Sequence, residues 1–258
     1  MTAQAPAAIP TMTAGRLLGA YLSEARYEAL RLLRMPAFSI PILVLPIVMY
    51  LFFAVLIAGG RGGPRVANWM YVGWTVFAIM GPGLFGFGIL VALERNQGLL
   101  TFKRALPMPP GVYLTAKIAM SMVFAAGVMA MLAAAGVLFG GVTLAPLQLV
   151  TVSAVMALGV APACAIGLFI GAWVPAQVAT AIANIVYLAM AFLGGLFFPL
   201  PPAMQAFRSI WPTYHLAQLA LASGGLPSQG AAWTHAAVLA GLTLVLTALA
   251  AQRLARAG

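Results

Sequence analysis

The sequence predicts an all-α polytopic membrane protein with six transmembrane helices, an N-terminal interfacial amphipathic helix, and both termini in the cytoplasm. Its 258 residues are 64% hydrophobic and 6% charged, whereas soluble domains carry about 25% charged residues. This composition excludes a soluble globular domain, and the high hydrophobicity excludes a disordered chain. The net charge of +10 does not indicate nucleic-acid binding, because that function needs a solvated basic surface.

The N-terminal part divides into a tail and a helix. Residues 1–13 are rich in Ala, Pro and Thr, lack a basic segment, and are expected to be a disordered tail rather than a signal peptide. Residues 14–35 place apolar side chains on one arc of a helix and mostly basic ones on the other, with Glu28 at the apolar edge. Such a helix suits the membrane interface. A cytosolic helix packed on a partner is the alternative.

Residues 36–258 form the predicted six-span domain. Each apolar run is long enough to cross a bilayer, which takes about 20 residues. The runs are 38–58, 68–92, 112–138, 147–173, 177–198 and 231–251. No acidic or basic residue lies in the middle of any of them. Lys117 lies in the first turns of the third run, where we expect it to snorkel to the lipid headgroups.

The distribution of Lys and Arg predicts the orientation. With the N-terminus inside, ten cations lie in inner segments and three in outer loops, as the positive-inside rule requires. The expected location is the bacterial cytoplasmic membrane, where the chain also contacts lipid. Two long loops result, an inner loop at 94–111 and an outer loop at 199–230, and long loops often carry function.

The chemistry of a soluble enzyme is missing. The Gly81–Gly86 segment matches G-x-G-x-x-G but lies inside a span, so it predicts a kink or a close helix contact rather than a dinucleotide site. His215 and His235 are too far apart in sequence for a helical metal pair and are expected to be interfacial. Cys164 is the single cysteine, so no intrachain disulfide is possible. We expect no catalytic residue, no metal site and no cofactor on this chain.

Charge is also missing from the centres of the spans, where ion-coupled transporters usually place it. The energy for uphill transport would therefore come from another subunit. The fourth span carries small residues at helical spacing, which allow close helix approach. Packing within the bundle and contact with a second subunit both remain open for this ridge, which consists of Gly159, Ala163, Gly167 and Gly171.

The inner loop joins an acid and a base at the end of a span to a short amphipathic segment that prolines end. Glu94 and Arg95 precede Gly98-Leu99-Leu100, and Leu106-Pro107 and Lys117 follow. The segment would form a short helix that fits into a groove of a partner. A second block, Gly194-Gly195-Leu196-Phe197-Phe198-Pro199, closes the fifth span, and Pro212-Thr213-Tyr214 follows. Together with six spans, these blocks resemble the permease subunits of type-2 (ABC-2 type) ABC exporters.

The resemblance implies a mechanism and a set of site residues. Two such permease chains, expected to be identical, would pair, and two separate ATPase subunits would bind ATP and Mg²⁺ and dock on the inner loops. Coupling to the ATPase subunit would fall to Glu94, Arg95, Gln97, Gly98, Leu100, Phe102, Lys103, Arg104 and Pro107. The charged members could instead serve topology and headgroup contact. The outer gate would contain Phe197, Phe198, Pro199, Trp211, Pro212 and Tyr214.

The leading functional hypothesis is therefore the permease subunit of an ATP-driven exporter for a hydrophobic or amphipathic compound, such as a drug, a natural product or a lipid. Export of a lipid-linked polysaccharide is a close alternative. An ion-coupled carrier or channel is an alternative of another class, and the uncharged spans disfavour it.

Overall fold

The computed structural model describes residues 14–58, 62–99 and 110–256, and every regular element in these ranges is helical. The predicted tail 1–13 and most of the predicted short helix after Gly98 lie outside the described residues. The elements are α1 (Ala14–Leu33), α2 (Pro36–Tyr50), η1 (Leu51–Ile57), α3 (Gly63–Gly81), η2 (Pro82–Ile89), α4 (Leu90–Asn96), α6 (Pro110–Leu138), α7 (Pro146–Leu158), α8 (Val160–Trp173), α9 (Ala176–Leu193), η3 (Pro202–Ile210), α10 (Pro212–Ser223) and α11 (Ala232–Arg256).

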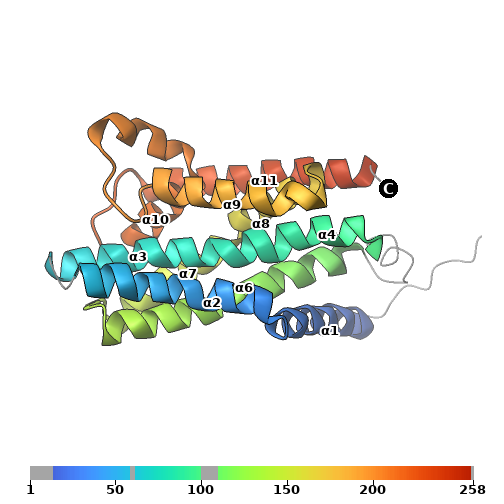
Figure 1. Ribbon diagram of the computed structural model, residues 1–258, viewed down its shortest axis with the longest axis horizontal. Coiled ribbons are helices and arrows are strands. Elements are labelled where there is room, and N and C mark those ends of the chain that lie inside the picture. Colours follow the sequence, from blue (N-terminus) through green and yellow to red (C-terminus); the bar gives the residue numbers. More distant parts are fainter. Residues whose placement is uncertain (1–13, 59–61, 100–109, 257–258) are drawn as a thin grey trace, which may run out of the picture.

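Six spans are long and apolar enough to cross a membrane within the described ranges, which confirms the predicted fold class. They are Pro36–Ile57, Gly63–Asn96, Val112–Leu138, Pro146–Trp173, Ala176–Leu193 and Ala232–Leu254. The second span is longer than predicted because α3, η2 and α4 form one continuous helical rod (Figure 1). The fifth is shorter, ending at Leu193, because Gly195 turns the chain with a φ of +71° that favours glycine.

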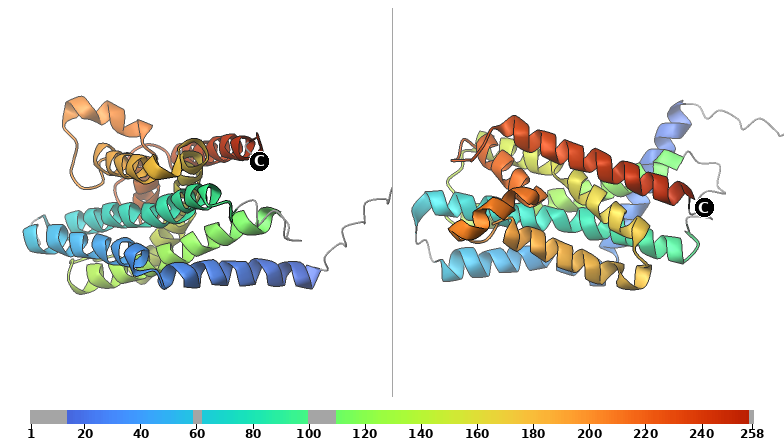
Figure 2. Two further views of the ribbon diagram at one scale, coloured as in Figure 1. Left: turned by 45° about the vertical axis from the view of Figure 1, so that its right-hand side comes forward. Right: turned by 90° about the horizontal axis from the view of Figure 1, so that it is seen from above.

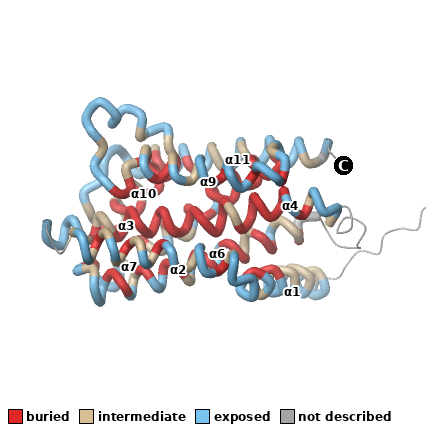
Figure 3. Tube along the Cα trace, in the orientation of Figure 1, coloured by how far each residue is buried: buried red, intermediate tan, exposed pale blue. Residues whose placement is uncertain are grey.

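The second span lies at the centre of the bundle. Most of its hydrophobic stretch is buried (Figure 3), whereas α2, α9 and α11 leave apolar side chains exposed, as lipid-facing helices do. Pro82 opens η2, a π-helical segment. Proline lacks the N–H that an α-helix uses at this position, so a local change of helix type follows.

Glycines bring η2 and α8 into direct backbone contact. A Cβ atom on Gly88 would lie 1.9 Å from the carbonyl carbon of Gly167, and one on Gly171 would lie 2.2 Å from the oxygen of Gly88. Within the Gly81–Gly86 segment, a Cβ atom on Gly83 would lie 2.6 Å from that of Ala163 and 2.9 Å from the backbone nitrogen of Cys164, so this segment makes the predicted close helix contact.

The small-residue ridge of the fourth span faces the same chain. Ala163 and Gly167 pack on η2, and Gly159 packs on Leu216 of α10. All four residues of the ridge are buried in this chain, so the ridge packs within the bundle. Contact of the ridge with a second subunit stays a prediction.

The bundle has two different ends (Figures 1 and 2). One end, called here the α4 end, brings together α1, the end of α4, the start of α6 and the C-terminal part of α11. The other, called the η3 end, carries η3, α10 and the α10–α11 connection. The cytoplasmic position of the termini, and hence of the α4 end, stays a prediction.

Candidate coupling site

A cluster of buried charges joins three helices at the α4 end. The ammonium group of Lys117, in α6, donates to Glu94 Oε1 in α4 at 3.1 Å and to Glu28 Oε2 in α1 at 3.3 Å. Arg31, also in α1, donates to the same Glu94 oxygen at 2.8 Å. Tyr113 donates to the other oxygen of Glu94 at 2.5 Å. The cluster therefore ties α1 to both helices that flank the inner loop.

Lys117 does not snorkel to the headgroups as predicted. Its side chain is fully buried, and the carboxylates of Glu28 and Glu94 are at most 5% exposed. A buried ammonium is tolerated when opposite charges and hydrogen bonds surround it. The centres of the spans carry no charged residue. Charge does lie near the span ends on this side, with Glu94 close to the end of the second span and Lys117 close to the start of the third.

The local sequence places each member of the cluster. On α1 the inward stripe centres on Glu28 and Leu32, which are buried, while Leu18 and Leu22 are more than 60% exposed. Glu28 and Arg31 lie three positions apart and so share one helix face. Tyr113 and Lys117, four apart on α6, do the same, so α1 and α6 each present two members of the cluster.

Arg31 is the member that reaches solvent, with 40% of its side chain exposed. Burial alone would lower the pKa of its guanidinium, but the hydrogen bond to Glu94 and the charge of Glu28 outweigh burial and raise this pKa. Arg31 therefore stays charged and completes an alternating arrangement of two cations and two carboxylates.

Arg95 turns the opposite way from Glu94 and caps a helix. Its guanidinium donates to the carbonyl of Ala172 at 2.6 Å and to that of Val174 at 3.1 Å. These carbonyls lie at the C-terminus of α8, where backbone acceptors lack helical partners and a cation is favourable. Arg95 thereby fastens the end of α4 to the end of α8.

Of the remaining predicted coupling residues, the structure describes the two at the start of the inner loop. Gln97 and Gly98 are exposed, and Gly98 has a φ of +74°, so the chain reverses there in a turn that suits glycine. Leu100, Phe102, Lys103, Arg104 and Pro107 lie outside the described residues. The sequence does not predict that Glu28, Arg31, Tyr113 and Lys117 meet. The one signal is the position of Glu28 at the apolar edge of its helix, which indicates that this carboxylate needs a partner.

At the η3 end the predicted gate residues divide into buried and exposed. Phe197 is buried against Trp74, with ring centroids 4.3 Å apart, and also packs on Phe77 and Phe192. Phe198 is 56% exposed. The buried gate residues are Phe197, Pro212 and Tyr214, Trp211 is half-buried, and Pro199 and Phe198 are exposed.

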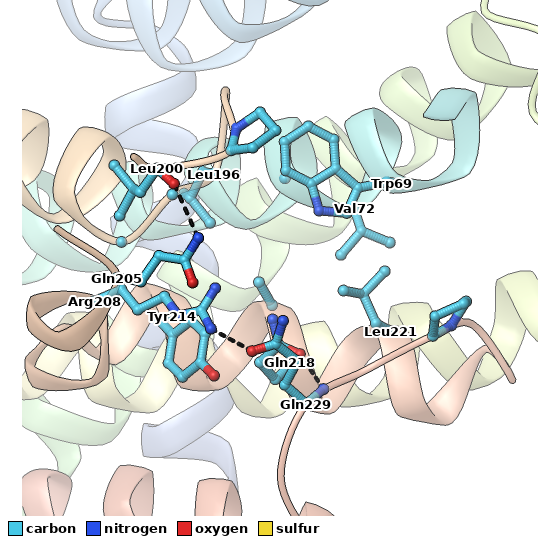
Figure 4. A pocket seen from close by; sticks show the side chains of 16 residues that line it. Trp69, Val72, Leu196, Leu200, Gln205, Arg208, Tyr214, Gln218, Leu221 and Gln229 are labelled. Carbon is cyan, nitrogen blue, oxygen red and sulfur yellow. Dashed lines mark hydrogen bonds between the residues drawn. The ribbon is translucent and has the colours of Figure 1, made fainter. Parts of the chain in front are cut away.

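A pocket of about 270 Å³ lies under η3. Figure 4 shows Gln205, Arg208 and Tyr214 on one side of it and Trp69 on the other. A second cavity, of about 380 Å³, lies between α2, α9 and the α3–η2 junction. Its lining holds no charged side chain.

The comparisons with known proteins agree with this architecture. Residues 21–223 match the ABC-2 type transporter family. The protein named "Putative transport permease YvfS" of Bacillus subtilis (strain 168) is 29% identical over 207 residues, which are 78% of this chain and 84% of that protein. An ABC-2 permease is a multi-pass membrane transport subunit that associates with an ABC ATPase, and in bacteria it resides in the inner membrane. Because the match covers most of the chain and the six spans agree with it, this protein belongs to the ABC-2 type transporter family.

Proposed function

We propose that this permease exports a hydrophobic or amphipathic compound, such as a drug, a natural product or a lipid, from the cytoplasm. ATP and Mg²⁺ would be bound by two separate ATPase subunits, and two copies of this chain would form the pathway. The observation that carries the proposed passenger is the cavity between α2, η2 and α9.

The lining of this cavity suits an apolar passenger. Phe38, Phe77 and Phe85 contribute aromatic surface, and α2 adds aliphatic side chains. The polar lining groups lie on α9, namely Thr180, Asn184 and Tyr187. Tyr187 is already engaged, because its hydroxyl donates to the carbonyl of Phe77 at 2.9 Å. Pockets that are mainly apolar with a few polar groups bind and orient such ligands.

The charge cluster at the α4 end supports the proposed coupling. The inner loop leaves α4 after Glu94 and returns at α6 before Lys117, and these residues are joined at 3.1 Å. A force on the loop would therefore move α4, α6 and, through Glu28, α1 together. The loop residues Gln97 to Pro107 would contact the ATPase subunit, and the η3 end would form the outer gate.

Placing a charged side chain in the cavity tests whether a hydrophobic passenger binds there. Asn184→Asp adds a carboxylate to the apolar lining, and Asn184→Leu is the matched control of similar size. We expect hydrophobic compounds to stimulate the ATPase activity of the reconstituted complex in the wild type and the Leu variant, and to lose at least about tenfold potency in the Asp variant. Equal potency in all three proteins would remove the cavity from the passenger's path.

The coupling assignment has its own test. Leu100→Asp with Phe102→Asp would place carboxylates on the apolar side of the predicted loop helix. We expect loss of co-purification with the ATPase subunit and loss of transport, while the six-span chain still inserts. Unchanged association and transport would contradict the assignment.

A further inference from the structure

The two histidines of the chain meet at the η3 end although 20 residues separate them. His215 lies in the first turn of α10 and His235 in the first turn of α11, and both are buried, at 7% and 5% exposure. Their Nδ1 atoms are 2.8 Å apart. The sequence predicted interfacial histidines and contained no signal for this contact.

Each ring also contacts a backbone carbonyl through its other nitrogen. His215 Nε2 lies 2.8 Å from the oxygen of Ser209 in η3, and His235 Nε2 lies 2.6 Å from the oxygen of Gln229 in the α10–α11 connection. A carbonyl oxygen can only accept, so each Nε2 must carry a hydrogen. The Nδ1 atoms then need one further hydrogen between them.

The proton count follows from these three contacts. Two neutral imidazoles carry two N–H groups, one each, whereas the three contacts need three N–H donors. We propose that His215 and His235 share one additional proton between their Nδ1 atoms, and that this proton closes η3 and the α10–α11 connection over the pocket beneath them. The proton comes from water and returns to water, and no other bond changes.

A metal ion fits the geometry less well than a proton. Metal-bound histidines do often donate their second N–H to a carbonyl, but two ligands of tetrahedral Zn²⁺ lie about 3.3 Å apart when each Zn–N distance is about 2.0–2.1 Å. The Nδ1 separation of 2.8 Å fits an N–H···N hydrogen bond. The described residues also hold no group of three or more His, Cys, Asp or Glu that could bind a metal.

The surroundings limit the pair to one extra proton. The three carboxylates of the chain lie in α1 and α4, and the nearby cation is Arg208 of η3, 5.0 Å from the ring centre of Tyr214, which packs edge-on against both histidines. Arg65 opens α3, and neither α7 nor α9 carries a charged side chain. Each histidine also lies in the first turn of its helix, where the helix dipole disfavours positive charge.

The pKa of His215 agrees with this limit. Burial lowers it, the Ser209 carbonyl opposes that effect, and the neighbouring His235 lowers it further. Interacting imidazoles titrate as a pair in two steps. The first proton satisfies all three contacts, and the second is opposed by burial and by the charge of the first.

The shared proton controls access to the pocket. Gln229 accepts from Arg208 of η3, and its backbone N–H donates to Gln218 Oε1 at 2.6 Å (Figure 4). Gln205, Arg208, Gln218 and Gln229 all line the pocket of about 270 Å³. Loss of the proton leaves two N–H donors for three contacts. Either one Nε2 gives up its hydrogen and its carbonyl contact, or both Nε2 atoms keep theirs and the two Nδ1 lone pairs repel each other. In both cases one link of the chain from η3 through the two rings to the α10–α11 connection is lost, and the pocket opens at that side.

Nuclear magnetic resonance can count the protons directly. With only two histidines in the chain, ring ¹⁵N labelling of the full protein in lipid gives signals from this pair alone. We expect both Nε2 atoms protonated and one hydrogen correlated with both Nδ1 atoms, until one proton per pair is lost as the pH rises. Two independent titrations without a shared hydrogen would overturn the proposal, as would signals that change when a chelator removes metal.

Hydrogen exchange of the backbone tests the closure. We expect exchange over 202–211 and 224–231, corrected for intrinsic rates, to rise at least about tenfold when the shared proton is lost, the effect of one charge-assisted hydrogen bond. His235→Gln should abolish this pH dependence, and so should His215→Gln. Ser209→Ala is the matched control, because it keeps the carbonyl and should behave as the wild type. If hydrogen exchange kept the same pH dependence in both Gln variants, the proposed closure by the shared proton would be refuted.

Discussion

Lys117→Met should be among the most destabilising single substitutions at the α4 end. The side chain is fully buried and lies 3.1 Å from Glu94 and 3.3 Å from Glu28, whose carboxylates are 1% and 5% exposed. Removing one partner of a buried ion pair costs about 3–5 kcal/mol, because the remaining charge is left in a medium of low polarity. Arg31 stays 2.8 Å from Glu94 and offsets part of this cost, so we expect about 3 kcal/mol.

The magnitude can be measured as the free energy of unfolding in mixed micelles with increasing denaturing detergent. Arg31→Gln is the first comparison: Arg31 is 40% exposed, solvent screens its charge, and we expect a loss of about 1 kcal/mol. Lys117→Met combined with Glu28→Gln and Glu94→Gln is the second, and it should recover at least half of the loss because no unbalanced charge remains. A Lys117→Met protein as stable as the wild type, or a triple variant as unstable as the single one, would refute this reasoning.

Three further outcomes are expected. Gly88→Ala should destabilise the protein by about 3 kcal/mol or more, because its Cβ would overlap the backbone of Gly167. Gly127→Ala, with open space around it, should instead stabilise by about 0.5–1 kcal/mol. Thermal unfolding in detergent compares the two variants. Arg95→Met should cost about 1.5–3 kcal/mol and raise hydrogen exchange at the end of α8, because two carbonyls lose a charged donor; normal exchange there would contradict the cap. The pKa of His215 is lowered from its ordinary value of 6.5, so the folded pair holds one proton and resists a second, whereas the two separate histidines of the unfolded chain bind two. Stability should therefore fall as the pH drops below 6.5, and His215→Gln should flatten this slope in unfolding measurements; a slope equal to that of the wild type would contradict it.

Hydropathy was sufficient to predict the spans, because every backbone polar group in lipid must be satisfied within a helix. The same reasoning could not locate the charge cluster, since the partners of Lys117 lie 23 and 89 residues away and snorkelling is judged from one helix alone. The Gly81–Gly86 segment could be predicted to form a kink or a close helix contact, because its position inside a span excludes a nucleotide-binding loop.

Two other features depended on tertiary contacts. Small residues at helical spacing do not reveal which helices they contact, and only the placement of η2 and α10 shows what the ridge packs on within this chain. The histidine contact requires α10 and α11 to start side by side, and the intervening connection carries no pattern that predicts this register.

The contact of η2 with α8 has a mechanical consequence. At Gly88 and Gly167 no side chains separate the two backbones, so there is no soft layer that could absorb a shift by changing rotamers. Arg95 fastens the next part of the rod, α4, to the end of α8. Gly73, at the other end of the rod, abuts the carbonyl of Leu196. The second span and α8 thus form a single stiff lever, with the charge cluster at one end and the break after the fifth span at the other.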